Sequence, residues 1–181
     1  MKIQIRSGVF ETNSSSTHAV AIGRKISRKG YPESMHFGLF DESDFYSYVN
    51  SVEDRADFLY TEILLSYYYD IEEIEKWKQK IIDYLAEEGI TDVDFERYYT
   101  TKNEEGDVEA DTYSMDLHID HDSVSRDFVT EILADKQTFF EYLFGDNSCI
   151  ILGRDGSNFE YVKKEKEKGS LIISDYFDSW Y

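Results

Sequence analysis

The segment from Ile71 to Glu88 constrains the fold most, because apolar residues recur in it at steps of three and four. These apolar residues are Ile74, Trp77, Ile81 and Leu85. Such spacing places them on one face of an α-helix, which turns once in about 3.6 residues. Gly89 follows directly, and glycine readily ends a helix in the left-handed conformation. A helix with one apolar face must bury it, so the segment predicts a packed domain with a helical layer.

Short apolar or alternating runs toward both ends of the chain predict strands. The predicted strands are Lys2–Phe10, Ala19–Ile22, Asp94–Thr101, Thr112–His121, Cys149–Leu152 and Leu171–Ile173. Tyr161 and Val162 are expected to pair with the last of these across the charged run Lys163–Lys168. The pair of strands around residues 102–111 reads as a hairpin with a long acidic connection.

The middle of the chain favours helices. The predicted helices are Asp41–Asn50, Val52–Asp70, Ile71–Glu88 and Ser123 to about Phe144. Residues 30–39 show no regular pattern and are expected to be irregular.

These elements predict an α+β fold with a mixed or antiparallel sheet. The sheet is built from N- and C-terminal strands, around a central group of about three to four helices. A chain of 181 residues fits one domain. Its parts would be an N-terminal strand–loop–strand motif (1–25), a helical middle (41–89), and a hairpin, helix and C-terminal strands (93–181).

Charge is distributed unevenly along the chain. The net charge is −19, yet residues 1–40 carry +4, which leaves −23 for the remaining residues. An acidic body of this kind is repelled by bare nucleic acid and suits a basic protein surface, such as the groove of a nucleic-acid enzyme. The alternative is that the acidity only keeps the protein in solution.

The sequence gives no sign of export or membrane insertion. It lacks both a run of about 18–20 apolar residues and the continuous apolar stretch of a secretory signal. Its single cysteine, Cys149, excludes an internal disulfide and fits a reducing compartment. We therefore expect a cytoplasmic protein with no membrane contact.

Residues 6–18 gather the most varied chemistry in the chain. Arg6, Glu11 and His18 supply a forked cation, a carboxylate and a group that titrates near neutrality. His18 or Glu11 could deprotonate a ribose 2′-hydroxyl while Arg6 stabilises the phosphate, which would cleave RNA without metal or cofactor. The residues expected to position and bind the RNA are Lys2, Asn13, Ser14, Ser15 and Ser16.

Two other interpretations of this motif remain open. Asn and Ser side chains often cap turns by bonding nearby backbone groups, and Arg6 could simply pair with Glu11. A serine nucleophile with His18 as base is less favoured, because no Gly-x-Ser-x-Gly turn surrounds the serines.

A second cluster lies in the strand predicted before residue 123. Alternation places Asp116, His118, Asp120 and Asp122 on one face, where two or three of them could bind a divalent metal. A solvent-facing strand that runs into a helix cap is the alternative, and the spacing matches no strong metal motif. We assign no metal site from it.

Three further features are interpreted as structural. Tyr67, Tyr68 and Tyr69 could stack on bases, but at an acidic helix end they more readily pack or contact protein. The Lys163–Lys168 run reads as a solvated mixed-charge edge, and Cys149 as an inert core residue.

The motif Arg-Ser-Gly-Val-Phe-Glu-Thr-Asn-Ser-Ser-Ser-Thr-His at residues 6–18 resembles a segment near the start of phage and prophage proteins from Gram-positive bacteria. Some of these resemble type II-A anti-CRISPR proteins, which inhibit Cas9. The resemblance covers residues 1–22, and a shorter one covers Ile119–Ser123.

The resemblance implies a phage protein that acts in the host cell on Cas9 or its guide-RNA complex. Guide RNA would then be the substrate of a metal-independent ribonuclease carried by Arg6, Glu11 and His18. The alternative is a non-catalytic acidic mimic of nucleic acid that blocks a basic channel of Cas9 or of another enzyme.

Overall fold

The computed structural model describes residues 19–27, 30–40, 48–67, 70–97, 100–102, 108–110, 127–151 and 159–173. The predicted strands Lys2–Phe10 and Thr112–His121 lie wholly outside the described residues, and so does most of the predicted helix Asp41–Asn50.

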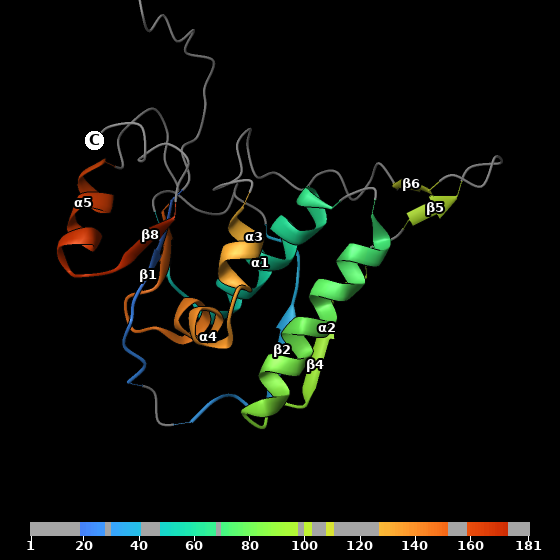
Figure 1. The fold of residues 1–181 in the computed structure, drawn as a ribbon, viewed down its shortest axis with the longest axis horizontal. Coiled ribbons are helices and arrows are strands. Elements are labelled where there is room, and N and C mark those ends of the chain that lie inside the picture. Colours follow the sequence, from blue (N-terminus) through green and yellow to red (C-terminus); the bar gives the residue numbers. More distant parts are fainter. Residues whose placement is uncertain are drawn as a thin grey trace, which may run out of the picture.

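The main sheet joins strands from both ends of the chain (Figure 1). Its order is β3 (Tyr48–Val49), β7 (Cys149–Ile151), β1 (Ala19–Ile22) and β8 (Leu171–Ile173), and every pairing is antiparallel. The central strand β1 sets Ala19 opposite Ile151 and Val20 opposite Ile173. The predicted α+β class, with a sheet of N- and C-terminal strands, is confirmed.

Helices cover both faces of this sheet. They are α1 (Val52–Ser66), α2 (Ile71–Glu87), α3 (Phe128–Ile132), α4 (Lys136–Phe144) and α5 (Phe159–Glu167). On one face, Val20, Ile22 and Ile150 join the main core, in which α1 packs against α2, α3 and α4. The other face carries a smaller cluster of Ala19, Ala21, Cys149 and Ile151, and α5 contacts its strands β1 and β8.

The two long helices form where their periodicity predicts them. Ser51 and Asp70 accept hydrogen bonds from the backbone N–H groups of Asp54 and Glu73, which caps the starts of α1 and α2. All four apolar residues of the pattern in α2 are buried. Gly89 ends this helix with a φ of 87°, as predicted.

A second, parallel pair of strands was not predicted. Residues 34–37, expected to be irregular, form β2 (Ser34–Phe37), which pairs with β4 (Asp92–Phe95). The expected strand Asp94–Thr101 is also wrong in extent, since β4 ends at Phe95. Strand β5 (Thr100–Lys102) begins at the end of that expected strand, and it forms a hairpin with β6 (Val108–Ala110), which lies in the stretch expected to be a loop. Parallel strands need a long crossover, and α1 and α2 supply it here.

Three other local predictions are corrected. Tyr48 and Val49 form a strand and not the end of a helix. The helix predicted from Ser123 to Phe144 is broken after α3, and Asp135 caps a new helix by accepting from the backbone N–H of Thr138. Residues 161–162, predicted to pair with β8, belong to α5, and β8 pairs with β1 instead.

Candidate functional site

The predicted catalytic and RNA-binding residues lie outside the described residues. They are Lys2, Arg6, Glu11, Asn13, Ser14, Ser15, Ser16 and His18. The candidate metal ligands Asp116, His118, Asp120 and Asp122 also lie outside. These assignments stay predictions.

Arg24 and Lys25 are the described cations of the basic region formed by residues 1–40, and β1 precedes them in the chain. Ala19, which follows His18 in the chain, begins β1 and is buried. Arg24 and Lys25 come after the other end, and a four-residue strand spans about 10 Å. The loop that carries them is fixed because the backbone N–H of Gly23 donates to Oγ of Ser148 (2.9 Å).

The best-defined polar surface in the described residues is the outer face of β2 and β4. Alternation exposes Ser34 and His36 on β2 and Asp92 and Asp94 on β4. We call this the β2–β4 face, and it includes Glu96, which follows β4. The opposite side of the two strands packs inward, where the rings of Phe37 and Phe95 stack with centroids 4.9 Å apart.

His36 and Asp94 are directly opposite each other in the parallel register. Nδ1 of His36 lies 3.2 Å from Oδ2 of Asp94, with side chains 58% and 78% exposed. A contact between side chains this open to water contributes about 0–1 kcal/mol. The pair is therefore suited to exchange its partners.

Side chains from α1 and from the end of β4 hold the chain as it leaves β2. The backbone N–H of Gly38 donates to Oδ1 of Asp57 (2.6 Å). That of Leu39 donates to Oε2 of Glu96 (3.0 Å), and that of Phe40 to Oγ1 of Thr61 (2.8 Å). The carboxylates of this region are thus fixed by backbone contacts.

Asp57 lies close enough to this surface for its carboxyl to be affected by the charges there. Burial raises the pKa of its carboxyl, and the neighbouring carboxylates of Asp54 and Glu96 raise it further. The N–H of Gly38 and the ring of His36 act in the opposite direction, but they do not cancel the rise. A cationic side chain placed here by a partner would relieve that repulsion.

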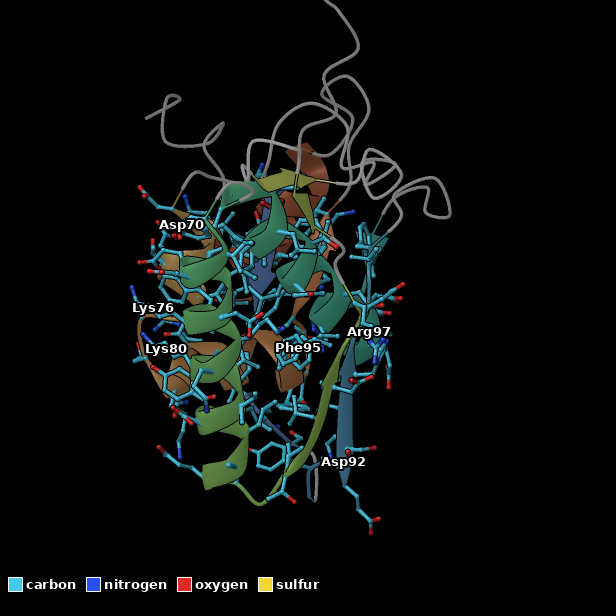
Figure 2. All side chains as sticks on the ribbon, turned by 90° about the vertical axis from the view of Figure 1, so that its right-hand side faces the viewer. Asp70, Lys76, Lys80, Asp92, Phe95 and Arg97 are labelled. Atoms are coloured by element: carbon cyan, nitrogen blue, oxygen red, sulfur yellow. The ribbon has the colours of Figure 1, made fainter. Side chains whose placement is uncertain are left out.

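Helix α2 extends the negative surface beside β4, as Figure 2 shows from Asp70 to Arg97. Residues 70–97 contain ten carboxylates and four cations. Nζ of Lys76 contacts Glu73 and Nζ of Lys78 contacts Glu75. Lys80 lies over the rings of Trp77 and Tyr84. The lysines of α2 are therefore engaged locally, and the excess charge of the surface is negative.

The described residues contain neither a cluster of metal ligands nor a membrane-spanning helix. No group of three or more His, Cys, Asp or Glu in this part is arranged to hold a metal ion. None of its helices is both long and apolar enough to cross a bilayer.

Sequence reasoning missed His36, Asp57, Asp94 and Glu96 as parts of one surface. The signal was weak but present, since Ser-Met-His-Phe and Asp-Val-Asp-Phe both alternate polar and apolar residues. Two predictions of structural roles fit the structure: Tyr67 packs against Trp77 (ring centroids 6.0 Å apart), and Cys149 is buried.

Comparison of the chain with protein-family models, with curated proteins and with solved structures finds no match.

Proposed function

We propose that this protein is an inhibitor that docks its acidic body on a basic face of a nucleic-acid enzyme. The motif resemblance makes Cas9 with its guide RNA the expected target. The observation that carries the proposal is the excess of carboxylates over residues 70–97, on α2 and on the β2–β4 face.

The physical basis is electrostatic complementarity. Cas9 holds its guide–target heteroduplex in a positively charged channel. Carboxylates on a helix and a strand have fixed backbone positions, so only their side chains lose conformational freedom on binding. Attraction of this kind speeds association and weakens as salt is added.

A target-DNA cleavage assay tests the proposal. Cas9 loaded with guide RNA is mixed with increasing amounts of the protein before target DNA is added. We expect inhibition that weakens between low and high salt. Neutralising two exposed carboxylates of α2, with Glu72→Gln and Asp83→Asn, should raise the half-inhibitory concentration about ten-fold.

Glu167→Lys is the matched control for that variant. It changes the net charge by the same two units, but at an exposed position of α5, which lies on the other side of the molecule from α2 (Figure 1). Equal loss of inhibition in both variants would mean that only net charge matters. No inhibition by the wild-type protein would overturn the proposal.

The same reactions test the predicted RNA chemistry of the N-terminal motif. Guide RNA recovered from the inhibited mixture is run on a denaturing gel, with and without chelator. Cleavage that survives chelator and is lost in Glu11→Ala and His18→Ala would support a metal-independent ribonuclease. Intact RNA under full inhibition would leave the binding mechanism alone.

A further inference from the structure

The backbone of β4 has one edge that no described strand occupies. The carbonyl oxygen of Phe37 accepts from the N–H of Glu96 (2.8 Å), which fixes the direction of the parallel ladder. Because alternate residues of a parallel strand point their backbone groups to opposite sides, Asp92 and Asp94 face β2. The N–H and C=O groups of Val93 and Phe95 face the other edge, and among the described residues β2 is the only strand paired with β4.

On the outer edge of β2, in contrast, side chains of α1 bind the backbone just past the end of the strand. Asp57 and Thr61 of α1 accept from the N–H groups of Gly38 and Phe40. These residues continue the outward-facing positions of β2. Proteins usually cover or block exposed strand edges, because such an edge can pair with another chain. The described residues place no such contact at the outer edge of β4, so that edge is the better candidate for pairing with a partner.

Charge determines which strand can pair there. Asp92 and Asp94 are exposed on the outer face of β4, and Glu96 continues the row at the same two-residue spacing. Like charges directly opposite each other destabilise cross-strand pairs, whereas opposite charges stabilise them. The row disfavours an acidic strand, including β4 of a second copy of this chain, and favours a basic one.

We propose that the outer edge of β4 accepts an extended basic segment of a partner protein as a third strand. Backbone hydrogen bonds to Val93 and Phe95 would supply affinity, and alternate side chains of the segment would supply specificity. Arg or Lys at every second position would face Asp92 and Asp94. Apolar residues between them would lie on the side of Val93 and Phe95, which are partly buried. This inference rests on the proposed function and names the surface through which the inhibitor engages its target.

Hydrogen exchange with a probe peptide tests the edge directly. The probe alternates arginine and valine over six residues, and a glutamate–valine peptide of equal length is the control. In the free protein, the amide hydrogens of Val93 and Phe95 should exchange faster than that of Asp94, which the register directs toward β2. The arginine–valine peptide should slow exchange at Val93 and Phe95 by at least about ten-fold. Binding without that protection would overturn the proposal, because it would be electrostatic association alone.

Substitutions distinguish the contribution of the backbone hydrogen bonds from that of the carboxylates. Val93→Pro removes the outward N–H and leaves the ladder to β2 intact, since proline is tolerated at strand edges. It should weaken the probe at least about ten-fold, while Val93→Ala, which only shortens the side chain, should have a small effect. Should Val93→Pro fail to fold by circular dichroism, Asp92→Asn with Asp94→Asn provides the test, against Glu167→Lys with the same charge change. Unchanged probe affinity in that double variant also overturns the proposal.

The outcomes distinguish this inference from the proposed function. If Val93→Pro leaves Cas9 inhibition unchanged, the edge of β4 is not used in inhibition. The proposal of an acidic inhibitor would then be unaffected. Probe binding with protection, in a protein that does not inhibit Cas9, would support the edge site and remove Cas9 as its target.

Discussion

The guanidinium of Arg55 donates through Nε to the carbonyl oxygen of Leu143 (3.2 Å) and so closes the C-terminal end of α4. Its Nη1 donates to the carbonyl oxygen of Asn50 (2.7 Å) and also to that of Ser148. The residue is 3% exposed. One cation in α1 thus joins the start of its own helix, the end of α4 and the turn before β7.

Replacing Arg55 is expected to destabilise the protein strongly. Arg55→Met leaves several buried carbonyl groups without donors, which should cost about 3 kcal/mol in the free energy of unfolding. Arg55→Lys should also destabilise, since an ammonium cannot reproduce the planar fork. Tyr142→Phe is the control, because it removes only the hydroxyl bond to the carbonyl of Arg55 (2.7 Å). It should cost about 1 kcal/mol in urea unfolding. A smaller loss in Arg55→Met than in Tyr142→Phe would contradict this account.

Gly145 is required for space and not for its backbone angles. Its φ of −62° and ψ of 135° suit any residue, but an added Cβ would collide with the carbonyl oxygens of Gly23 and Glu141 and with Oγ of Ser148. Gly145→Ala should therefore cost at least about 2 kcal/mol. Gly30 has a φ of 95°, but a Cβ added there would meet open space. Gly30→Ala should therefore lower the free energy of unfolding by only about 1 kcal/mol. Thermal unfolding of the two variants would show the reverse order if backbone angle were decisive.

Local signals account for the elements that the sequence predicts well. The apolar spacing of α2, with Asp70 before it and Gly89 after it, is complete within 20 residues of chain. The α3–α4 break also had a local signal, the capping side chain of Asp135. It was obscured because apolar residues continue on both sides of it.

The rest of the fold depends on contacts between distant segments. His36 and Asp94 are 58 residues apart, and only the parallel register brings them together. Tyr161 and Val162 favour a strand by residue type, yet they belong to α5, and Lys168, directly after this helix, pairs with Glu165 within it. The alternation in each segment indicates two separate strands, but no pattern within a single short segment shows that β2 and β4 pair.

Asp135 should make the stability of α4 depend on pH. Its carboxylate accepts from the N–H and hydroxyl of Thr138 (both 2.9 Å), and these bonds lower its pKa below 3.8. A lowered folded-state pKa gives stability that is present above the unfolded value and lost as pH falls through the folded one. Asp135→Ala should cost about 1 kcal/mol at pH 7, and less below about pH 3. Asp135→Asn keeps a capping oxygen without titrating, so its unfolding free energy should not follow this trend.

Asp57 is expected to act with the opposite sign. Burial raises its pKa above 3.8, so the folded state holds the proton more tightly than the unfolded state. Its contribution is therefore present at low pH and lost as pH rises through the raised value. Asp57→Asn can still accept from the N–H of Gly38 and does not titrate. The free energy of unfolding of Asp57→Asn should therefore increase relative to that of the wild-type protein between about pH 3 and pH 7. A constant difference across that range would show that the carboxyl titrates normally.

Cys149 should resist alkylation for as long as the sheet is intact. It is 8% exposed in β7, and burial raises the pKa of its thiol to about 11. Only the thiolate reacts with iodoacetamide, so at neutral pH both the scarcity of thiolate and the lack of access oppose the reaction. We expect modification at least about 100-fold slower in the folded protein than in urea. Equal rates would mean that β7 separates readily from β1 and β3. Because Arg55 holds the carbonyl of Ser148 beside Cys149, Arg55→Met should accelerate the reaction, whereas Tyr142→Phe should change it less.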